Sequence, residues 1–69
     1  MEMFNLDGRE FIELNNLLKV AGKCPSGGVA KMIIGAGHVT VDGQVELRKR
    51  CQIRSGQIIE FEGQQITIV

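Results

Sequence analysis

Two consecutive segments with helical spacing of apolar residues, joined by a very short connection, most constrain the fold of this chain. The first segment, LNNLLKVAG at residues 14–22, places apolar side chains three, four and seven positions after Leu14. That spacing corresponds to one face of a helix, and Gly22 predicts where the helix stops. Because the second segment follows after only a few residues, we expect the two helices to be antiparallel neighbours or to cross at an angle.

The second helical segment follows the sequence KCPSGG. Ser26 is a good N-cap, and Pro25 before it suits a chain that is not yet helical. Ala30 is small enough to let another helix approach closely, and Gly37 predicts an end in the left-handed conformation that glycine tolerates best. The apolar stripe between these limits consists of Val29, Ala30, Ile33 and Ile34, with Ala36 as its extension.

The N-terminal segment favours an extended conformation. MFNL at residues 3–6 alternates between apolar and polar side chains and predicts a first strand, which Asp7-Gly8 follows as a turn signal. EFIE at residues 10–13 suits either an extended segment or the start of the first helix.

Two hairpins are predicted in the second half of the chain. HVTVDGQVEL turns at the Asp-Gly pair of residues 42–43. A two-residue loop would place Val41 opposite Gln44. The apolar alternation would instead place Val39 and Val41 on one face with Val45 and Leu47. We therefore expect a longer loop or a bulge.

The second hairpin, QIIEFEGQQITIV, turns near Gly63. A strand, two helices and then several strands predict an α+β fold, with two adjacent helices packed on one side of a small, mostly antiparallel sheet. The chain has 69 residues, so we expect a single domain over residues 1–69 with a small core and no deep pocket.

Several features bear on the cellular location. No run of about 18 apolar residues is present, which predicts no membrane span and no membrane partner. The acidic N-terminal segment lacks the pattern of a signal peptide, so we expect a cytoplasmic, monomeric protein. In that compartment Cys24 and Cys51 should stay reduced.

Residues suited to catalysis or metal binding are scarce. His38 is the one histidine, and with Cys24 and Cys51 it supplies at most three metal ligands at a spacing unlike that of a zinc site. The sequence thus predicts no enzymatic activity, no metal and no cofactor. Cys51 suits either a thiol whose pKa is lowered by its basic neighbours or, as we favour, a small buried residue that anchors its loop.

Charge is unevenly distributed although the net charge is zero. Residues 1–18 carry four acidic side chains and one basic one, residues 19–54 carry seven basic and two acidic ones, and residues 55–69 carry two acidic ones. Four of the seven basic residues fall within RKRCQIR at residues 48–54. This pattern predicts one molecular face suited to a polyanion.

The start of the second helix is a candidate anion site. Ser26-Gly27-Gly28 leaves bare backbone N–H groups at the positive end of a helix, an arrangement that suits a phosphate. Close packing of the two glycines against the first helix or the hairpin explains them equally well on local grounds.

The aromatic residues narrow the class of nucleic-acid ligand. Only Phe4, Phe11 and Phe61 are present, with no Trp or Tyr. We expect all three in the core, which leaves no platform for stacking the bases of single strands. A nucleic-acid partner would then be bound through its phosphates and its shape.

The ordered pattern SGGVAKMIIGAGHVTVDG at residues 26–43 resembles the RNA-binding domain family named after the fourth small-subunit ribosomal protein, the S4-like αL motif. The resemblance covers about residues 12–60 and is strongest to short stand-alone bacterial members of the YbcJ type. It implies binding of structured RNA, often ribosomal RNA. Many members carry basic residues where this chain has Gly27, Gly35 and Thr40, which implies that the basic run at residues 48–50 supplies the charge instead.

These observations together predict a non-enzymatic protein that binds structured or double-helical RNA, such as ribosomal RNA, through a basic face and a helix N-terminus. The alternative is a protein-interaction adaptor that uses the same basic face on an acidic partner, for example a ribosomal protein. The expected RNA-binding residues are Lys19, Lys23, Ser26, Gly27, Gly28, Lys31, His38, Arg48, Lys49, Arg50 and Arg54.

Overall fold

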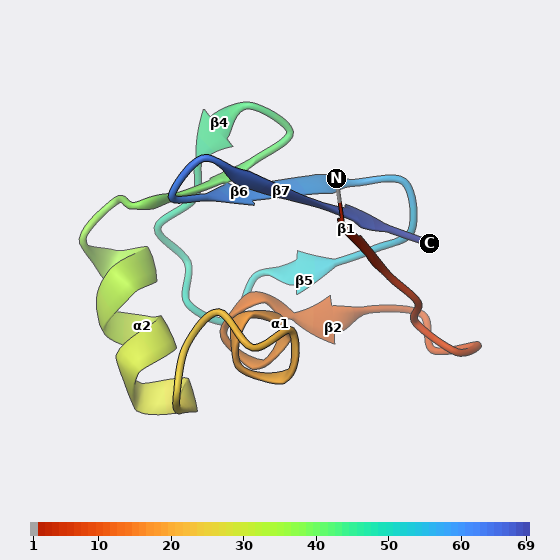
Figure 1. The fold of residues 1–69 in the computed structure, drawn as a ribbon, viewed down its shortest axis with the longest axis horizontal. Helices are drawn as coiled ribbons and strands as arrows, with labels where there is room; N and C mark the ends of the chain where they lie inside the picture. The colour runs from red at the N-terminus through yellow and green to blue at the C-terminus, as the bar shows by residue number, and fades with distance from the viewer. Residues whose placement is uncertain (1) are drawn as a thin grey trace.

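The computed structural model describes residues 2–69 and arranges them in two layers (Figure 1). In chain order the elements are β1 (Glu2–Phe4), β2 (Ile12–Glu13), α1 (Leu14–Val20), α2 (Gly27–Gly35), β3 (Val39–Val41), β4 (Gln44–Val45), β5 (Gln52–Ile53), β6 (Ile58–Phe61) and β7 (Gln64–Ile68). One layer is a five-stranded sheet in the order β1-β7-β6-β3-β4, and the other contains both helices and the two-stranded β2–β5 ribbon.

The strand pairing confirms the predicted α+β class. Among the strands of residues 2–69, only β1 and β7 pair in parallel, and the other pairs in the five-stranded sheet are antiparallel. Both helices lie on the same side of the sheet (Figure 1). Neither of them, within the described part of the chain, is long and apolar enough to cross a membrane.

The helices begin and end where local signals predict. The Ser26 hydroxyl accepts a hydrogen bond from the Val29 N–H at 3.2 Å, which is the predicted N-cap. Gly22 and Gly37 follow the two helices with φ angles of 77° and 85°. The expected extension of the second apolar stripe was wrong, because α2 ends at Gly35 and Ala36 is an exposed C-cap residue.

The first hairpin has a tight two-residue turn, so the expected longer loop or bulge was wrong. Asp42 and Gly43 both have positive φ angles, 51° and 84°, as a type I′ turn requires. Val41 pairs with Gln44 in the resulting register.

The Asp42 side chain explains why the turn overrides the apolar alternation. Its carboxylate accepts a hydrogen bond from the Ile58 N–H at 2.9 Å, which fastens the turn to β6. The register that follows leaves Val45 59% exposed and Leu47 58% exposed. The turn chemistry and its anchor on the neighbouring strand therefore decide the register.

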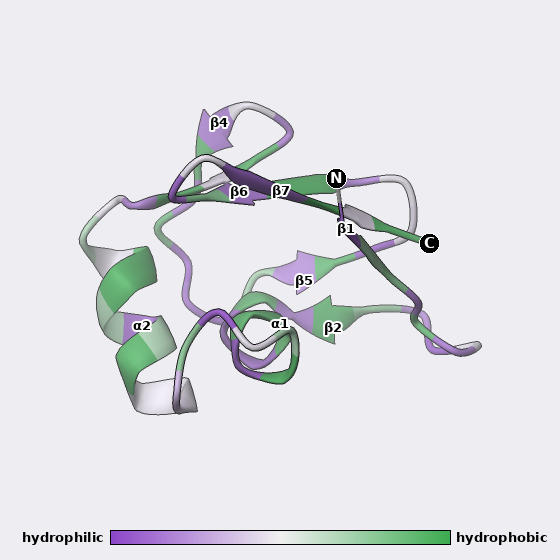
Figure 2. Cartoon of the chain, in the orientation of Figure 1, coloured by the Kyte–Doolittle hydropathy of each residue, from purple (hydrophilic) through white to green (hydrophobic). Residues whose placement is uncertain are grey.

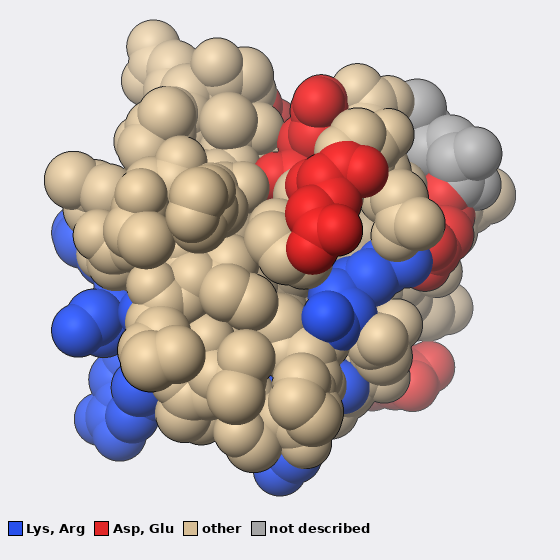
Figure 3. All heavy atoms as spheres, turned by 60° about the vertical axis from the view of Figure 1, so that its left-hand side comes forward, with Lys and Arg blue, Asp and Glu red and all other residues tan. Residues whose placement is uncertain are grey.

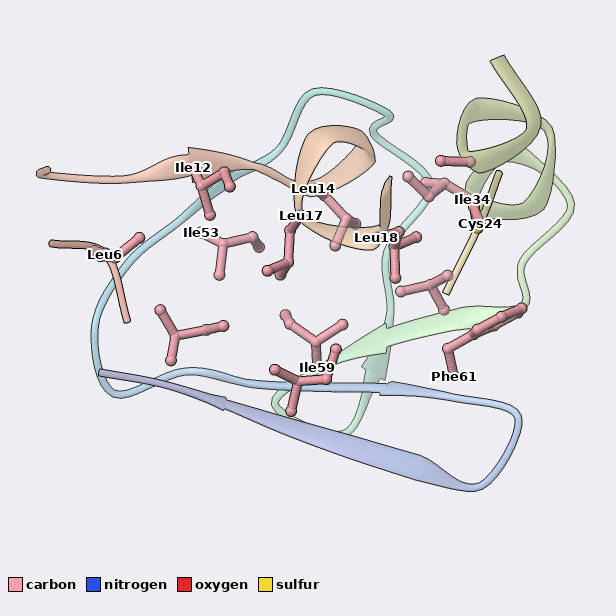
Figure 4. Packing of buried hydrophobic residues seen from close by; sticks show 14 residues of the cluster. Leu6, Ile12, Leu14, Leu17, Leu18, Cys24, Ile34, Ile53, Ile59 and Phe61 are labelled. Carbon is pink, nitrogen blue, oxygen red and sulfur yellow. The ribbon is translucent and has the colours of Figure 1, made fainter. Parts of the chain in front are cut away.

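The core lies between the two layers (Figure 4). Side chains from the helices and from the β2–β5 ribbon point toward the sheet, and within residues 2–69 no polar or charged side chain is buried. Figure 2 shows hydrophobic and hydrophilic residues side by side in β7 and α1, whereas the connection between β4 and β5 is largely hydrophilic. The buried residues are Leu6, Ile12, Leu14, Leu17, Leu18, Cys24, Ala30, Ile34, Val39, Ile53, Ile59, Phe61, Ile66 and Ile68.

Phe11 lies outside this core, so the expectation that all three phenylalanines are core residues was wrong. Phe61 is buried and Phe4 packs against the core, but Phe11 is half-buried and does neither. Ile12 and its partner Ile53 both point into the core. Because successive side chains of a strand point to opposite faces, Phe11 is directed away from the sheet.

Candidate nucleic-acid interface

The connection between β4 and β5, residues 46–51, is here called the basic loop, and it is fastened to the start of α1. The Leu14 N–H donates to the Cys51 carbonyl at 2.9 Å, and the Asn15 N–H donates to the Lys49 carbonyl at 3.1 Å. The first N–H groups of a helix have no partner within it, and the Glu13 side chain does not cap them. The loop carbonyls therefore act as the cap of α1 and fasten the backbone of the basic loop to the helix.

Three arginines share one shallow surface depression of about 540 Å³. This arginine depression is lined by Arg48, Arg50, Cys51, Gln52 and Arg54. The Lys49 side chain extends instead toward the end of α2, where its Cε would lie 3.2 Å from a Cβ placed on Gly35. Figure 3 shows basic side chains gathered along one edge of the molecule.

Arg48 is held by a carboxylate on its own loop. Its Nε and Nη2 atoms donate to the two oxygens of Glu46 at 3.0 and 3.1 Å, and its backbone N–H donates to Oε2 at 2.9 Å. These hydrogen bonds from the Arg48 side chain and backbone lower the pKa of Glu46 from its usual 4.5 to about 2. Glu46 thus offsets part of the charge that Arg48 offers to an anion.

Cys51 anchors the basic loop without being fully buried. It packs against the core, and burial raises the pKa of its thiol, with the Glu46 charge adding to that effect. The interpretation that its basic neighbours lower this pKa was therefore wrong. Arg48 Nη2 lies 3.5 Å from the Cys51 Sγ atom, while the Arg48 side chain as a whole is 78% exposed.

Lys23 does not join the other basic residues. Its ammonium group donates to the Glu2 carboxylate and, at 2.6 Å, to the Gln64 side-chain oxygen, and its side chain is only 13% exposed. These partners belong to β1 and β7, on the sheet. In Figure 3 the acidic side chains gather beside one basic group, apart from the basic edge.

The remaining predicted side chains are dispersed. Lys19 is exposed in the last turn of α1, at the end opposite the docked loop. Lys31 is half-buried on α2. His38 is exposed and lines a separate depression with Ile33, Phe61 and Glu62.

The start of α2 presents free backbone amides. Within residues 2–69 the N–H groups of Gly27 and Gly28 have no hydrogen-bond partner. A Cβ on either glycine would meet one atom at 3.8 Å, the Asn15 Nδ2 or the Ser26 Oγ, which is ordinary contact. Close packing therefore does not require glycine at these positions, which was the alternative explanation.

Asn15, which belongs to no motif in the sequence, connects the basic loop with the start of α2. Its backbone donates to the basic loop, and its side-chain amide faces Gly27 at the start of α2. The side-chain Oδ1 atom is buried without a partner among the described residues. Phe11 and Gln52 were also missed, because their roles depend on the pairing of β2 with β5. Glu46 was missed although its partner Arg48 is only two positions away.

Comparison with known proteins places the whole chain in one family. Residues 4–69 match the S4 domain family. The chain is 45% identical to YbcJ of Escherichia coli strain K12 and to YbcJ of Shigella flexneri over 69 residues, which is 100% of this chain and 99% of each relative.

Two solved structures are similar. The solution structure of Escherichia coli YbcJ, described as revealing an αL motif involved in RNA binding, superposes with a TM-score of 0.77 at 45% identity and covers 100% of this chain and 87% of that one. Ribosomal protein S4e from Thermoplasma acidophilum gives 0.61 at 23% identity over 83% of this chain and 30% of that one, which shows a shared fold.

Proposed function

Because this chain belongs to the S4 domain family, we propose that it is a non-enzymatic RNA-binding protein that recognises structured RNA, with ribosomal RNA as the leading class. The full-length similarity to YbcJ, whose solved structure carries an αL motif involved in RNA binding, supports this function. The observation that carries the proposal is the arginine depression, held against α1 by the capping carbonyls of the basic loop.

Phosphate neutralisation is the proposed source of affinity. Arg48, Arg50 and Arg54 present planar guanidinium groups that can each bind a phosphate through two hydrogen bonds. Lys49 adds a charge on the side of α2. Because the loop carbonyls cap α1, little conformational freedom of the loop backbone has to be lost on binding.

The start of α2 is proposed as a second phosphate contact. The free N–H groups of Gly27 and Gly28 lie at the positive end of the helix dipole, and Ser26 caps the same turn. Asn15 lies between this turn and the basic loop, so one RNA backbone could reach both. Lys19, Lys31 and His38 are proposed as peripheral contacts, and Lys23 is left out because its charge is paired with Glu2.

Replacing Arg48, Lys49 and Arg50 together with alanine tests this function. We expect a large loss of affinity for a structured RNA and a decrease of about 3 in the magnitude of the salt slope, about 1 for each phosphate contact removed. Fluorescence anisotropy titrations of a labelled ribosomal RNA hairpin at several salt concentrations measure both quantities.

Arg9→Ala is the matched control, since Arg9 donates to the Leu6 carbonyl at 2.9 Å and lies outside the arginine depression. An affinity and a salt slope left intact in the triple variant would refute the proposed interface. If the unmodified protein bound no naked RNA at moderate salt but did bind an acidic ribosomal protein, it would instead be an adaptor.

A further inference from the structure

Phe11 and Arg54 form a pair on the outer face of the β2–β5 ribbon. Ile12 pairs with Ile53 and Glu13 pairs with Gln52, so continuing the same antiparallel register places Phe11 opposite Arg54. The guanidinium carbon of Arg54 lies 5.8 Å from the centroid of the Phe11 ring. A cation within about 6 Å of a ring centroid is attracted to the face of the ring.

Arg54 is held at its backbone as well as at its side chain. Its N–H donates to the Gln57 side-chain oxygen at 2.8 Å, and its carbonyl accepts from the Gln57 N–H at 3.3 Å. Its Nη2 atom lies 3.4 Å from the side-chain oxygen of Gln52. These contacts fix the guanidinium group over the ring.

The supported guanidinium lies in a setting suited to a nucleobase. Arg54 is exposed, and both Arg54 and Gln52 line the arginine depression with Arg48 and Arg50. Bases of single-stranded RNA segments stack on aromatic rings and on guanidinium planes. The Gln52 amide has donors and an acceptor that can meet the edge of a base.

We propose that Arg54, supported by Phe11, is a stacking platform for one unpaired base, with Gln52 at the edge of that base. The preferred ligand is then a structured RNA that carries a bulged or overhanging nucleotide beside its stem, while Arg48 and Arg50 bind the flanking phosphates. This inference rests on the proposed RNA-binding function and narrows its ligand.

Two RNA hairpins with the same stem test the platform, one fully paired and one with a single bulged 2-aminopurine. We expect the unmodified protein to bind the bulged hairpin about tenfold more tightly than the paired one, the order expected for one stacked base. Binding should also quench the 2-aminopurine fluorescence. Arg54→Lys keeps the charge but removes the plane, and Phe11→Leu keeps apolar bulk but removes the ring.

Both variants should lose most of the tenfold preference and the quenching, while Phe11→Leu, which leaves every charge in place, changes affinity for the paired hairpin less than about twofold. Arg50→Lys is the control, because the same exchange in the same depression should leave the preference intact. Equal affinity of the unmodified protein for the two hairpins, or an equal loss for both in Phe11→Leu, would overturn the inference. Salt-sensitive binding of the paired hairpin would then leave the proposed function standing, whereas failure to bind either RNA would refute both.

Discussion

Glu46 is the residue with the most direct control over the charge of the basic loop. Its carboxylate accepts three hydrogen bonds from Arg48, two of them from the guanidinium group. A carboxylate stabilised in this way has a lower pKa in the folded protein than in the unfolded chain. Glu46 therefore links the stability of the loop to pH and limits how strongly Arg48 can bind an anion.

Glu46→Gln should reduce the acid sensitivity of the fold. Because the folded pKa of Glu46 is lowered from 4.5 to about 2, its stabilising contribution is present above about pH 4.5 and is lost as the pH falls toward 2. The difference in unfolding free energy between the parent protein and this variant should thus shrink across that range. Urea denaturation followed by circular dichroism at several pH values measures it, and a constant difference would contradict the assignment.

The same substitution should strengthen RNA binding at neutral pH. With the carboxylate removed, Arg48 is free to contact a phosphate, so affinity should rise severalfold and the magnitude of the salt slope by about 1. Glu60→Gln removes an equal charge from β6, outside the arginine depression, and is the control. If both variants gained equally, net charge would explain the effect, and the Glu46–Arg48 pair would have no special role.

The first turn of α2 contains residues that lower the stability of the helix. Glycine is among the poorest helix formers, and two glycines follow the Ser26 cap. Neither has a positive φ angle, and neither is in tight contact, so the backbone would tolerate alanine. Packing therefore does not explain the two glycines, whereas a phosphate contact at their backbone N–H groups would.

Gly28→Ala should therefore raise the stability of the fold and lower its affinity for RNA. The free energy of unfolding should rise by about 0.5–1 kcal/mol, because alanine favours the helix. RNA affinity should fall severalfold, because a methyl group would crowd a phosphate at this turn. Met32→Ala, at a position 70% exposed on the same helix, is the control for affinity. Unchanged affinity in Gly28→Ala would remove the start of α2 from the interface.

At the scale of the whole molecule, the net charge is zero although basic and acidic side chains lie on two separate surfaces. Within residues 2–69 no acidic residue lines the arginine depression, although Glu46 contacts Arg48 beside it. Glu2 and Glu60 line another depression along β1, β6 and β7. The molecule measures 29 × 22 × 18 Å, and exposed charges are largely screened beyond about 8 Å at physiological ionic strength. The arginine depression can therefore attract a polyanion although the whole protein is neutral.

Lys23→Ala should affect stability and leave binding nearly unchanged. Its ammonium group joins the connection between the helices to β1 and β7, so its loss should cost about 1 kcal/mol of unfolding free energy. RNA affinity should change less than about twofold. Lys49→Ala removes the same charge from the basic loop and should weaken binding severalfold. Equal losses of affinity in the two variants would show that only total charge matters.

The sequence by itself determined the parts of the molecule that depend on neighbouring residues. The helices, their Ser26 and Gly22 boundaries and the positions of the two hairpin turns were predicted, because each rests on interactions among residues a few positions apart. The two-residue geometry of the first turn was not predicted, since it depends on the contact of Asp42 with β6. The family was recognised for a similar reason, since its pattern occupies one continuous stretch, residues 26–43.

Only the tertiary structure decided which charges and rings act together. Lys23 meets Glu2 across 21 positions, the basic loop caps α1 across more than 30, and Phe11 meets Arg54 on the far side of the ribbon. These contacts arise because the two layers must bury their apolar faces against each other, which brings distant segments together in one register. No local spacing encodes that outcome. The arginines of residues 48–54 share one depression, whereas Lys23 is paired with Glu2 on the sheet and Lys19 and Lys31 lie apart from both.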